Sequence, residues 1–308
     1  GWEAGAGRSG GDVTSWRLTG TQAAGGQCVS VSPGHVPPVP GQCVGWRPPS
    51  AGHWAHSTAQ HCTAHTGHWG QMDGAFGYAS IVSDKSGILQ LGDEHPDDAI
   101  HQRKVEDLSK RYACFRRTLG DGNCFYRALS FAYLEALLGN SKGVQKLRKI
   151  LMRSKGELLS MGFIESTFEN AFNTFMDVID LVEADVSGAK LLAVFNDRNT
   201  SDCLVLYLRL LTSAYLQKKS EFFEYFLEGG MSIKDFCTQE VEPMAMESDH
   251  IHITALTQAL NIPIQVEYMD KSNTAVNHHI FPEGSKPLVY LLYKPGHYDI
   301  LYKANKSK

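Results

Sequence analysis

Apolar side chains recur at three- and four-residue spacing through much of the chain beyond residue 96, which is the pattern of helices that bury one face. The clearest case is the stretch from Glu165 to Glu183, where the apolar positions that share a face are Phe168, Phe172, Phe175, Ile179 and Val182. Similar spacing and capping residues predict further helices over residues 97–112, 124 to about 139, 200 or 201 to 216, 220 to 229, and 251–260. We interpret the aromatic stripe over residues 165–183 as part of a buried core.

Strand-like runs are concentrated near the end of the chain. They cover residues 263–269, 279–281, 288–293 and 297–302, and the turn Lys294-Pro295-Gly296 separates the last two. Helices that come first and consecutive strands that come later are typical of an α+β domain. The sequence therefore predicts a helical N-terminal part packed on a small, mainly antiparallel sheet that is formed late in the chain.

The first 75 residues show no useful helical or strand period. Residues 1–70 hold all five tryptophans and fourteen of the 29 glycines but no lysine, and runs such as Pro37-Pro38-Val39-Pro40 interrupt any regular element. We therefore predict a low-complexity, disordered leader over residues 1–75 and one folded domain over residues 76–308. Because the chain begins with Gly1 and its first methionine is Met72, a second interpretation is that this leader is not native coding sequence.

Six of the thirteen histidines also fall within residues 1–70, and four potential metal ligands there lie close together in the sequence: His61, Cys62, His65 and His68. Residues of these types can bind zinc. Their spacing matches no zinc-finger pattern, however, and the segment has too little aliphatic content to form a core around an ion. We therefore predict that the protein uses no metal and no organic cofactor.

Composition narrows the class of protein. The longest uninterrupted apolar runs, residues 203–208 and 288–293, have six residues each, which is too few to cross a bilayer, and the N-terminus lacks the pattern of a secretory signal. Seven cysteines, an odd number at irregular spacing, favour free thiols in a reducing compartment, so we expect a cytoplasmic protein. Residues 1–70 contribute +1 to the formal net charge of −4, which leaves −5 for the rest and gives no reason to expect nucleic acid as a partner.

A glycine-punctuated loop leads directly into a helical pattern at Cys124. The stretch from Gly120 to Leu129 reads Gly-Asp-Gly-Asn-Cys-Phe-Tyr-Arg-Ala-Leu, and its glycines and Asp121 disfavour a helix, whereas the apolar period begins at Phe125. We therefore predict that Cys124 lies at a helix N-terminus, where unpaired backbone N–H groups and the helix dipole favour a thiolate. Backbone amides of the turn from Asp121 to Cys124 are placed to bind an oxyanion that forms beside the sulfur. The alternative is an ordinary buried cysteine.

A base with an orienting partner decides between these alternatives, because cysteine nucleophiles in intracellular enzymes act with a histidine. His297 opens the last predicted strand, and Asp299 lies two residues further on. Residues two apart in a strand point to the same side, so the Asp299 carboxylate can hold the His297 imidazole. The competing histidines, His250, His252, His278 and His279, have no acid two residues further along a strand. The sequence therefore predicts a catalytic set of Cys124, His297 and Asp299.

The motifs Gly-Asp-Gly-Asn-Cys-Phe-Tyr-Arg-Ala at Gly120 and Gly-His-Tyr-Asp-Ile-Leu-Tyr at Gly296 together resemble those of the otubains, which are ovarian-tumour-type deubiquitinating cysteine proteases. The resemblance extends from about residue 97 to residue 303, and it includes residues 207–213, 239–244 and 247–253. The C-terminal segment is more similar to otubain-1-like members, because the residue two positions after the histidine is Asp299 and not asparagine.

This resemblance implies a papain-like fold of the ovarian-tumour type over residues 76–308 and a thiol-dependent hydrolase of ubiquitin isopeptide bonds. It assigns the nucleophile to Cys124, the base to His297 and the orienting acid to Asp299, with Asp121 in the oxyanion loop. It also implies ubiquitin and polyubiquitin as partners, for which the candidate binding residues are Phe222, Phe226, His250, Tyr293 and Tyr298. Because otubain-1-like proteins share a preference for the proteasome-targeting lysine linkage, we expect that preference here.

The main alternative is a binding protein that inhibits charged ubiquitin-conjugating enzymes without cleaving a bond. In the family this role depends on a helical arm ahead of the domain, whereas residues 74–96 here contain glycines and a proline where such a helix would lie. A third interpretation is a generic papain-like acyltransferase. Covalent labelling by an electrophilic ubiquitin probe would favour the hydrolase over the inhibitor.

Overall fold

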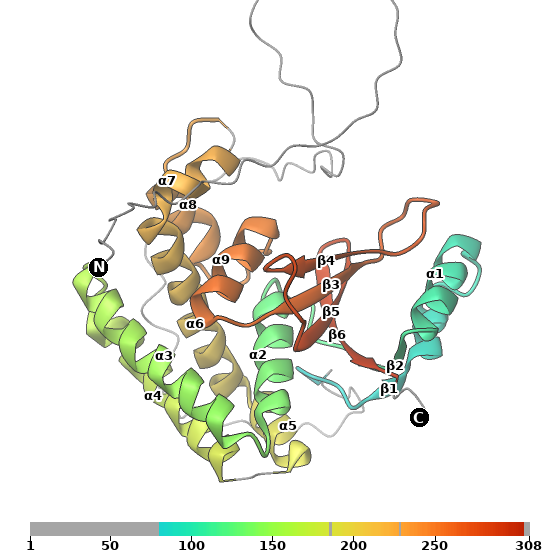
Figure 1. Ribbon diagram of the computed structural model, residues 1–308, viewed down its shortest axis with the longest axis horizontal. Coiled ribbons are helices and arrows are strands. Elements are labelled where there is room, and N and C mark those ends of the chain that lie inside the picture. Colours follow the sequence, from blue (N-terminus) through green and yellow to red (C-terminus); the bar gives the residue numbers. More distant parts are fainter. Residues whose placement is uncertain (1–79, 185–186, 228, 305–308) are drawn as a thin grey trace, which may run out of the picture. The chain divides into compact units, whose positions relative to one another are not determined.

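The computed structural model describes residues 80–184, 187–227 and 229–304. The predicted leader over residues 1–75, together with its potential metal ligands, lies outside these residues. Of residues 74–96, where an arm helix was considered, residues 80–96 are described, and they contain a two-residue strand and one short helix rather than a long helical arm. Figure 1 shows a sheet of six strands with helices gathered on one side and helix α1 (Ala99–Ser109) on the other. The predicted α+β class is confirmed.

The helices dominate the middle of the chain. In chain order they are η1 (Ile88–Glu94), α1, α2 (Cys124–Leu137), α3 (Ser141–Ser160), α4 (Glu165–Glu183), α5 (Gly188–Asn196), α6 (Arg198–Lys218), α7 (Ser220–Phe223), η2 (Glu224–Phe226), α8 (Ile233–Phe236), η3 (Cys237–Val241) and α9 (His250–Leu260). The helix predicted over residues 165–183 is confirmed with the same bounds as α4, because its apolar stripe is long and unbroken. Among the described helices, none is both long and apolar enough to cross a membrane.

The sheet is mixed, with one parallel pair. Its strands are β1 (Ser86–Gly87), β2 (Tyr112–Arg116), β3 (Ile264–Tyr268), β4 (Asn277–Phe281), β5 (Val289–Lys294) and β6 (His297–Lys303). The strand order is β1-β2-β6-β5-β3-β4, and every neighbouring pair is antiparallel except β3 and β5. The sheet is therefore mainly antiparallel, as predicted, and it is largely formed by the last four strands.

Alternate residues of the central strands face two separate cores. Leu291 and Ile300 are opposite one another in the β5–β6 pair and belong to the core that contains α2, α4 and α6. Leu292 and Leu301, the next residues along, pack instead with α1 and η1. Because side chains alternate across a strand, both faces of the sheet are covered, and the strands read as nearly continuous apolar runs.

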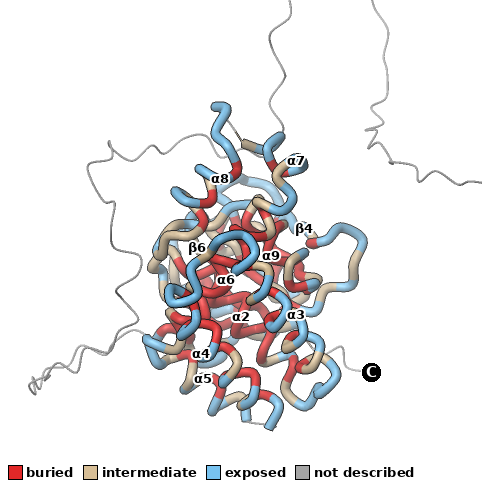
Figure 2. The backbone as a smooth tube through the Cα atoms, turned by 90° about the vertical axis from the view of Figure 1, so that its left-hand side faces the viewer, coloured by how far each residue is buried: buried red, intermediate tan, exposed pale blue. Residues whose placement is uncertain are grey.

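Helices α2 and α6 run through the interior on the larger side of the sheet. Figure 2 shows their backbone as buried over most of its length, and twelve of the fourteen residues of α2 are buried. A helix that is apolar nearly all round needs such a surrounding. The first residue of α2 therefore sits on a rigid element.

Several predicted boundaries near the ends of elements are wrong. The helix predicted over residues 97–112 ends at Ser109, and Tyr112 begins β2 instead, because β2 pairs with β6 almost two hundred residues later. Helix α6 begins at Arg198, since the Asp197 side chain accepts the Thr200 N–H at 2.9 Å and caps it. The helix predicted over residues 220–229 is a single turn, α7, followed by the short η2, which ends at Phe226.

Candidate active site

Cys124 is the first residue of α2 and is 4% exposed. The preceding loop turns sharply, because Gly122 has a φ of +77°, which L residues rarely adopt. The predicted position of Cys124 at a helix start is confirmed. Cys237 provides a contrast, since burial raises the pKa of its thiol to about 12 and makes it a structural cysteine.

The Asp121 carboxylate shapes the loop rather than facing the thiol. Its Oδ1 accepts the Asn123 N–H at 3.1 Å, and its Oδ2 accepts a hydrogen bond from Arg127 Nη2 at 2.9 Å. Burial opposes ionisation of Asp121, but the hydrogen bond and charge of Arg127 hold the pKa of Asp121 below its ordinary value. Arg127 is itself fully buried and also pairs with Asp202 at 2.5 Å. This network ties the loop to α2 and α6.

Arg209 of α6 holds the other side of the loop. Its fully buried guanidinium donates to the Gly122 carbonyl at 3.0 Å, the Asn123 side-chain oxygen at 2.9 Å and the Met246 carbonyl at 2.7 Å. The Asn123 oxygen also accepts the Ala245 N–H at 2.9 Å. The two loops are so close that a Cβ on Gly122 would lie 2.0 Å from the Ala245 carbonyl oxygen. These four hydrogen bonds, which join residues far apart in the sequence, therefore fix the backbone just ahead of Cys124.

The amide groups of the loop are used unequally, which corrects the expected oxyanion site. The Asp121 N–H donates to the Leu119 carbonyl at 3.1 Å, and the Asn123 N–H is taken by the Asp121 side chain. Within the described part of the chain, the backbone N–H groups of Gly122 and Cys124 donate no hydrogen bond to a protein acceptor. These two amides, rather than that of Asp121, are available to an oxyanion beside the sulfur.

His297 begins β6 directly after a tight turn at Gly296, whose φ is +75°. Its Nε2 lies 2.8 Å from Asp299 Oδ1, so the Asp299 interaction predicted from the two-residue spacing is confirmed. Its Nδ1 faces the loop, 3.6 Å from where a Cβ on Gly120 would lie. Burial disfavours the imidazolium, but hydrogen bonds with Asp299 and Cys124 outweigh it and raise the pKa of His297 to about 9.

Asp299 is completely buried and has partners on both oxygens. Oδ1 also accepts the Thr118 N–H at 3.0 Å, and Oδ2 lies 2.9 Å from Lys294 Nζ. Lys294 in turn pairs with Glu94 of η1, at 2.9 and 3.1 Å. Although burial opposes ionisation, the contacts with His297 and Lys294 keep the pKa of Asp299 below its ordinary value. The carboxylate is therefore ionised and fixed in position, as an orienting acid must be.

The geometry supports acyl transfer by a cysteine nucleophile. Because Nε2 is bonded to the Asp299 carboxylate, it carries a proton, and Nδ1 is the nitrogen that exchanges a proton with Cys124. Two unoccupied amides lie on the loop beside the sulfur. Within the described residues, no group of three or more histidine, cysteine, aspartate and glutamate side chains could hold a metal ion.

The candidate binding residues on α7 and η2 form an exposed apolar surface. Phe222 and Phe226 are 54% and 62% exposed, whereas Phe223 between them is buried. Tyr225 is 89% exposed, and it was not among the residues predicted from the sequence. We call the exposed set of Phe222, Tyr225 and Phe226 the α7–η2 surface. Its single helical turn explains why three phenylalanines in five residues do not all face the core.

His250, Tyr293 and Tyr298 differ in what they offer to a partner. His250 is exposed and packs on Phe281, with ring centroids 4.9 Å apart. Tyr293 is half-buried beside Tyr298, whose ring lies 5.0 Å away. Tyr298 itself is 4% exposed and packs on Phe125 at 5.4 Å, so the prediction that it contacts a partner is corrected to a packing role beneath the catalytic residues.

Comparison with known proteins finds one family. Residues 78–303 match the family model described as Peptidase C65 Otubain. Ubiquitin thioesterase OTUB1 of Homo sapiens is 58% identical over 225 residues, which cover 72% of this chain and 83% of that protein. Ubiquitin thioesterase OTUB2 of Mus musculus is 54% identical over 227 residues, which cover 74% of this chain and 97% of that protein.

Solved structures agree with the sequence relatives. The chain in a complex of ceOTUB1 with ubiquitin aldehyde and UBC13~Ub superposes with a TM-score of 0.70 at 29% identity, covering 74% of this chain and 95% of that one. The corresponding h/ceOTUB1 complex with UBCH5B~Ub gives 0.69 at 30% identity, covering 74% and 91%. The ovarian-tumour-type fold implied by the sequence motifs is confirmed, and this chain belongs to the otubain family of C65 peptidases.

Proposed function

We propose that this chain is a thiol-dependent deubiquitinase that hydrolyses the isopeptide bond between the C-terminus of ubiquitin and a lysine amine. One observation supports this function: three side chains are arranged as a catalytic triad. Cys124 lies at a helix start, His297 is in hydrogen-bond contact with it, and Asp299 lies 2.8 Å from the imidazole. The substrate class rests on the relatives, which are named ubiquitin thioesterases.

The proposed reaction has two steps at one sulfur. The thiol proton of Cys124 moves to Nδ1 of His297, and the thiolate attacks the isopeptide carbonyl. The C–N bond breaks, the imidazolium returns its proton to the leaving lysine amine, and a thioester between ubiquitin and Cys124 remains. His297 then takes a proton from water, whose oxygen attacks the thioester carbonyl. The C–S bond breaks, ubiquitin leaves with a free C-terminal carboxyl group, and the imidazolium returns its proton to the Cys124 sulfur.

The surrounding residues stabilise the charges that these steps develop. The amides of Gly122 and Cys124 are placed for the negative oxygen of each tetrahedral intermediate. Asp299 stabilises the imidazolium and fixes its tautomer. We assign Asp121 a supporting role, because its carboxylate holds the loop and its own amide is bonded to Leu119.

We assign the α7–η2 surface to ubiquitin binding, with His250 and Tyr293 as further contacts. Exposed aromatic residues that cluster together are typical of protein interfaces. We also expect the proteasome-targeting lysine linkage to be cleaved faster than other linkages. The odd number of cysteines supports a cytosolic setting, and the four described cysteines are not in disulfides.

A second candidate function is the binding and inhibition of charged ubiquitin-conjugating enzymes. The similar chains named above were solved with UBC13~Ub and UBCH5B~Ub, which favours this possibility for the present fold. The described residues 80–96, where a helical arm was considered, contain β1 and the short η1 rather than a long helix. The two functions are compatible, because one uses the sulfur and the other a surface.

A ubiquitin probe with a C-terminal electrophile tests the hydrolase directly. We expect covalent labelling of the parent and no labelling of Cys124→Ala. Cys114→Ala is the matched control, because Cys114 is a half-buried cysteine on β2 outside the site, and it should be labelled like the parent. Tight binding of a charged conjugating enzyme without any labelling would instead support the inhibitor, and equal cleavage of all di-ubiquitin linkages would refute the linkage preference.

A further inference from the structure

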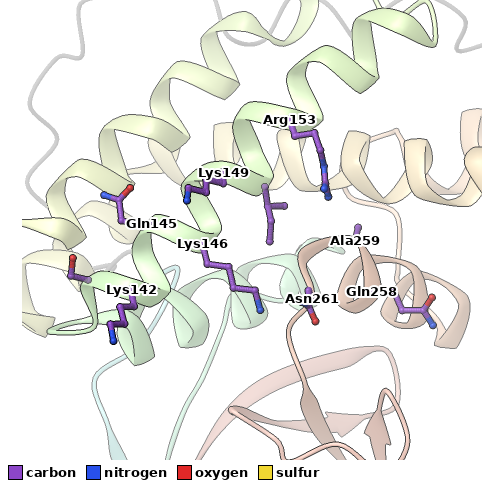
Figure 3. A pocket seen from close by; sticks show the side chains of 10 residues that line it. Lys142, Gln145, Lys146, Lys149, Arg153, Gln258, Ala259 and Asn261 are labelled. Atoms are coloured by element: carbon purple, nitrogen blue, oxygen red, sulfur yellow. The ribbon is translucent and has the colours of Figure 1, made fainter. Parts of the chain in front are cut away.

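A basic groove of about 640 Å³ lies between α3 and α9, and none of the residues that line it belongs to the catalytic set. One wall is cationic and the other carries amides, and the residues that matter are Lys142, Lys146, Lys149, Arg153, Gln258 and Asn261. Figure 3 shows Lys146 and Arg153 reaching from α3 toward the end of α9. Two of the four cationic side chains are therefore directed into the hollow between α3 and α9, and the other two lie along its edge on α3.

The four cations recur at the spacing of one helix face. Lys142, Lys146, Lys149 and Arg153 are separated by four, three and four residues. At about 1.5 Å per residue they extend over roughly 16 Å of the axis of α3. Like charges at this spacing destabilise a helix by about 0.2–0.5 kcal/mol per pair. The four cations therefore slightly destabilise α3 unless an anion binds along them.

Other cations of α3 differ, because acidic residues of the protein pair with them. Arg148 lies 2.5 Å from Asp180, and Lys155 lies 2.7 Å from Glu165, both acids of α4. Among the described residues, by contrast, no acidic group lies within ion-pair distance of the three groove lysines. Arg153 lies 3.5 Å from Glu157 of its own helix. The protein thus neutralises the face of α3 that packs on α4 and leaves the groove face charged.

We propose that this groove binds an acidic peptide segment of a partner protein in an extended conformation. An extended chain advances about 3.3 Å per residue, so the row of cations matches about five residues, of which alternate side chains would face α3. Carboxylates would pair with the lysines, and the exposed Gln258 and Asn261 amides would bond the peptide backbone on the opposite wall. Exposed ion pairs are weak and salt-sensitive, so binding is reversible.

Nucleic acid fits this groove less well. Its lining contains no aromatic side chain on which a base could stack. Beyond residue 70 the chain carries a net charge of −5, so a polyanion much longer than the groove would run onto repulsive surface. A sum of charges cannot reveal such a groove, which is why no basic patch was expected from the net charge.

Fluorescence anisotropy with the full-length chain tests the assignment. The probe is a fluorescein-labelled peptide of six glutamates flanked by glycines, titrated at low salt and again at physiological salt. We expect saturable binding that weakens with salt, and a loss of about tenfold or more in affinity for Lys146→Glu with Lys149→Glu, which removes two pairs and adds two repulsions. Lys146→Gln with Lys149→Gln should lose less, and it guards against misfolding of the charge-reversed protein.

Lys190→Glu with Lys286→Glu is the matched control, because both lysines are exposed, lie outside the groove and give the same change in net charge. This control should bind within about twofold to threefold of the parent, since only long-range charge differs. Equal weakening in both double variants would overturn the groove in favour of a general charge effect. Absence of peptide binding at low salt would overturn it too. Tighter binding of a twelve-residue oligothymidylate through the same lysines would replace the peptide with nucleic acid.

Discussion

The two oxygens of Asp299 have separate partners, so substitutions at this residue distinguish its contributions. Asp299→Ala removes the acceptor from Nε2 of His297, and we expect turnover to fall by about 10- to 1000-fold with less effect on substrate affinity. The alkaline limb of the pH profile should also move. Asp299 and Cys124 together raise the pKa of His297 to about 9, so without Asp299 the imidazolium loses its proton at lower pH and activity declines earlier as pH rises.

Asp299→Asn gives the matched comparison in single-turnover and pH-profile measurements. Its amide oxygen can still accept from Nε2, but the amide nitrogen then faces Lys294, which lies 2.9 Å from Oδ2 in the parent. We therefore expect a loss intermediate between the parent and Asp299→Ala. If Asp299→Ala matches the parent in both rate and pH profile, Asp299 does not orient the base.

Lys294 is expected to be a positioning residue for the same carboxylate. Lys294→Met keeps most of the side-chain volume but leaves Asp299 Oδ2 and Glu94 without their shared cation. Because Lys294 helps to keep the pKa of Asp299 low, removing its charge should raise that pKa, so activity should fall more at acidic than at neutral pH. Breaking such a largely buried pair should also lower the free energy of unfolding by about 3–5 kcal/mol.

Lys85→Met is the control for Lys294→Met. Lys85 pairs with Glu135 at 3.4 Å but is 44% exposed, so its loss should change the free energy of unfolding by less than about 1 kcal/mol and leave the pH profile unchanged. Kinetics between pH 5 and 9 and chemical denaturation measure both effects. If the pH profile of activity has the same acidic limb in Lys294→Met and in the parent, Lys294 has only a structural role.

The catalytic residues were predictable because each carries a local signal. Cys124 follows a glycine loop at the start of an apolar helical period, and His297 and Asp299 are two residues apart in one strand. Their supports carry no such signal. Arg209 contacts Gly122 across 87 positions, and Lys294 reaches Glu94 across 200, so only the folded chain brings these partners together.

At the scale of elements, the loop ahead of α2 depends on a residue without a side chain. Gly122→Ala would place a Cβ 2.0 Å from the Ala245 carbonyl oxygen in a backbone conformation that L residues avoid. We expect the free energy of unfolding to fall by about 2–5 kcal/mol, which combines about 1–2 kcal/mol of backbone strain with the steric overlap. Turnover should fall as well, because Cys124 and its neighbouring amides would move.

Gly162→Ala isolates the backbone contribution. Gly162 has a φ of +89° in the turn between α3 and α4, and nothing lies within 4 Å of where its Cβ would be. We expect it to lower the free energy of unfolding by about 1–2 kcal/mol and to leave turnover unchanged. Thermal melts and di-ubiquitin cleavage compare the two variants. Equal effects of both on turnover would mean that contact between the two loops does not position the nucleophile.

The helix with the aromatic stripe, α4, was predicted closely, whereas α3 and α5 were not predicted, and elements that depend on distant partners were missed. The apolar repeat that predicts α4 lies entirely within the nineteen residues of that helix. Strands β1 and β2 are short, and β2 is ordered by pairing with β6 at the other end of the chain. The parallel pairing of β3 with β5 was missed for the same reason, because a run of apolar residues does not indicate which strand it pairs with or in which direction.

At the scale of the whole molecule, the core explains why the domain should fold without the leader. Three buried apolar clusters form between Ile81 and Leu301 and cover both faces of the sheet and the end of α6. A domain of about 230 residues buries roughly 70–75% of the surface that its unfolded chain exposes. The nucleophile Cys124 belongs to the first of these clusters, and so does Tyr298, which follows the base on β6.

We therefore predict that a chain beginning at residue 76 melts within about 2 °C of the full-length protein and cleaves di-ubiquitin within about twofold of its rate. Calorimetry and single-turnover kinetics on the two proteins make the comparison. The control is a chain beginning at residue 90, which lacks β1 and the buried Ile88 that packs in the cluster on the α1 side of the sheet. It should be less stable, because β2 loses its pairing partner and the cluster loses apolar contacts. If the chain beginning at residue 76 is as impaired as that control, residues 1–75 contribute to the stability of the domain, and its N-terminal boundary lies earlier.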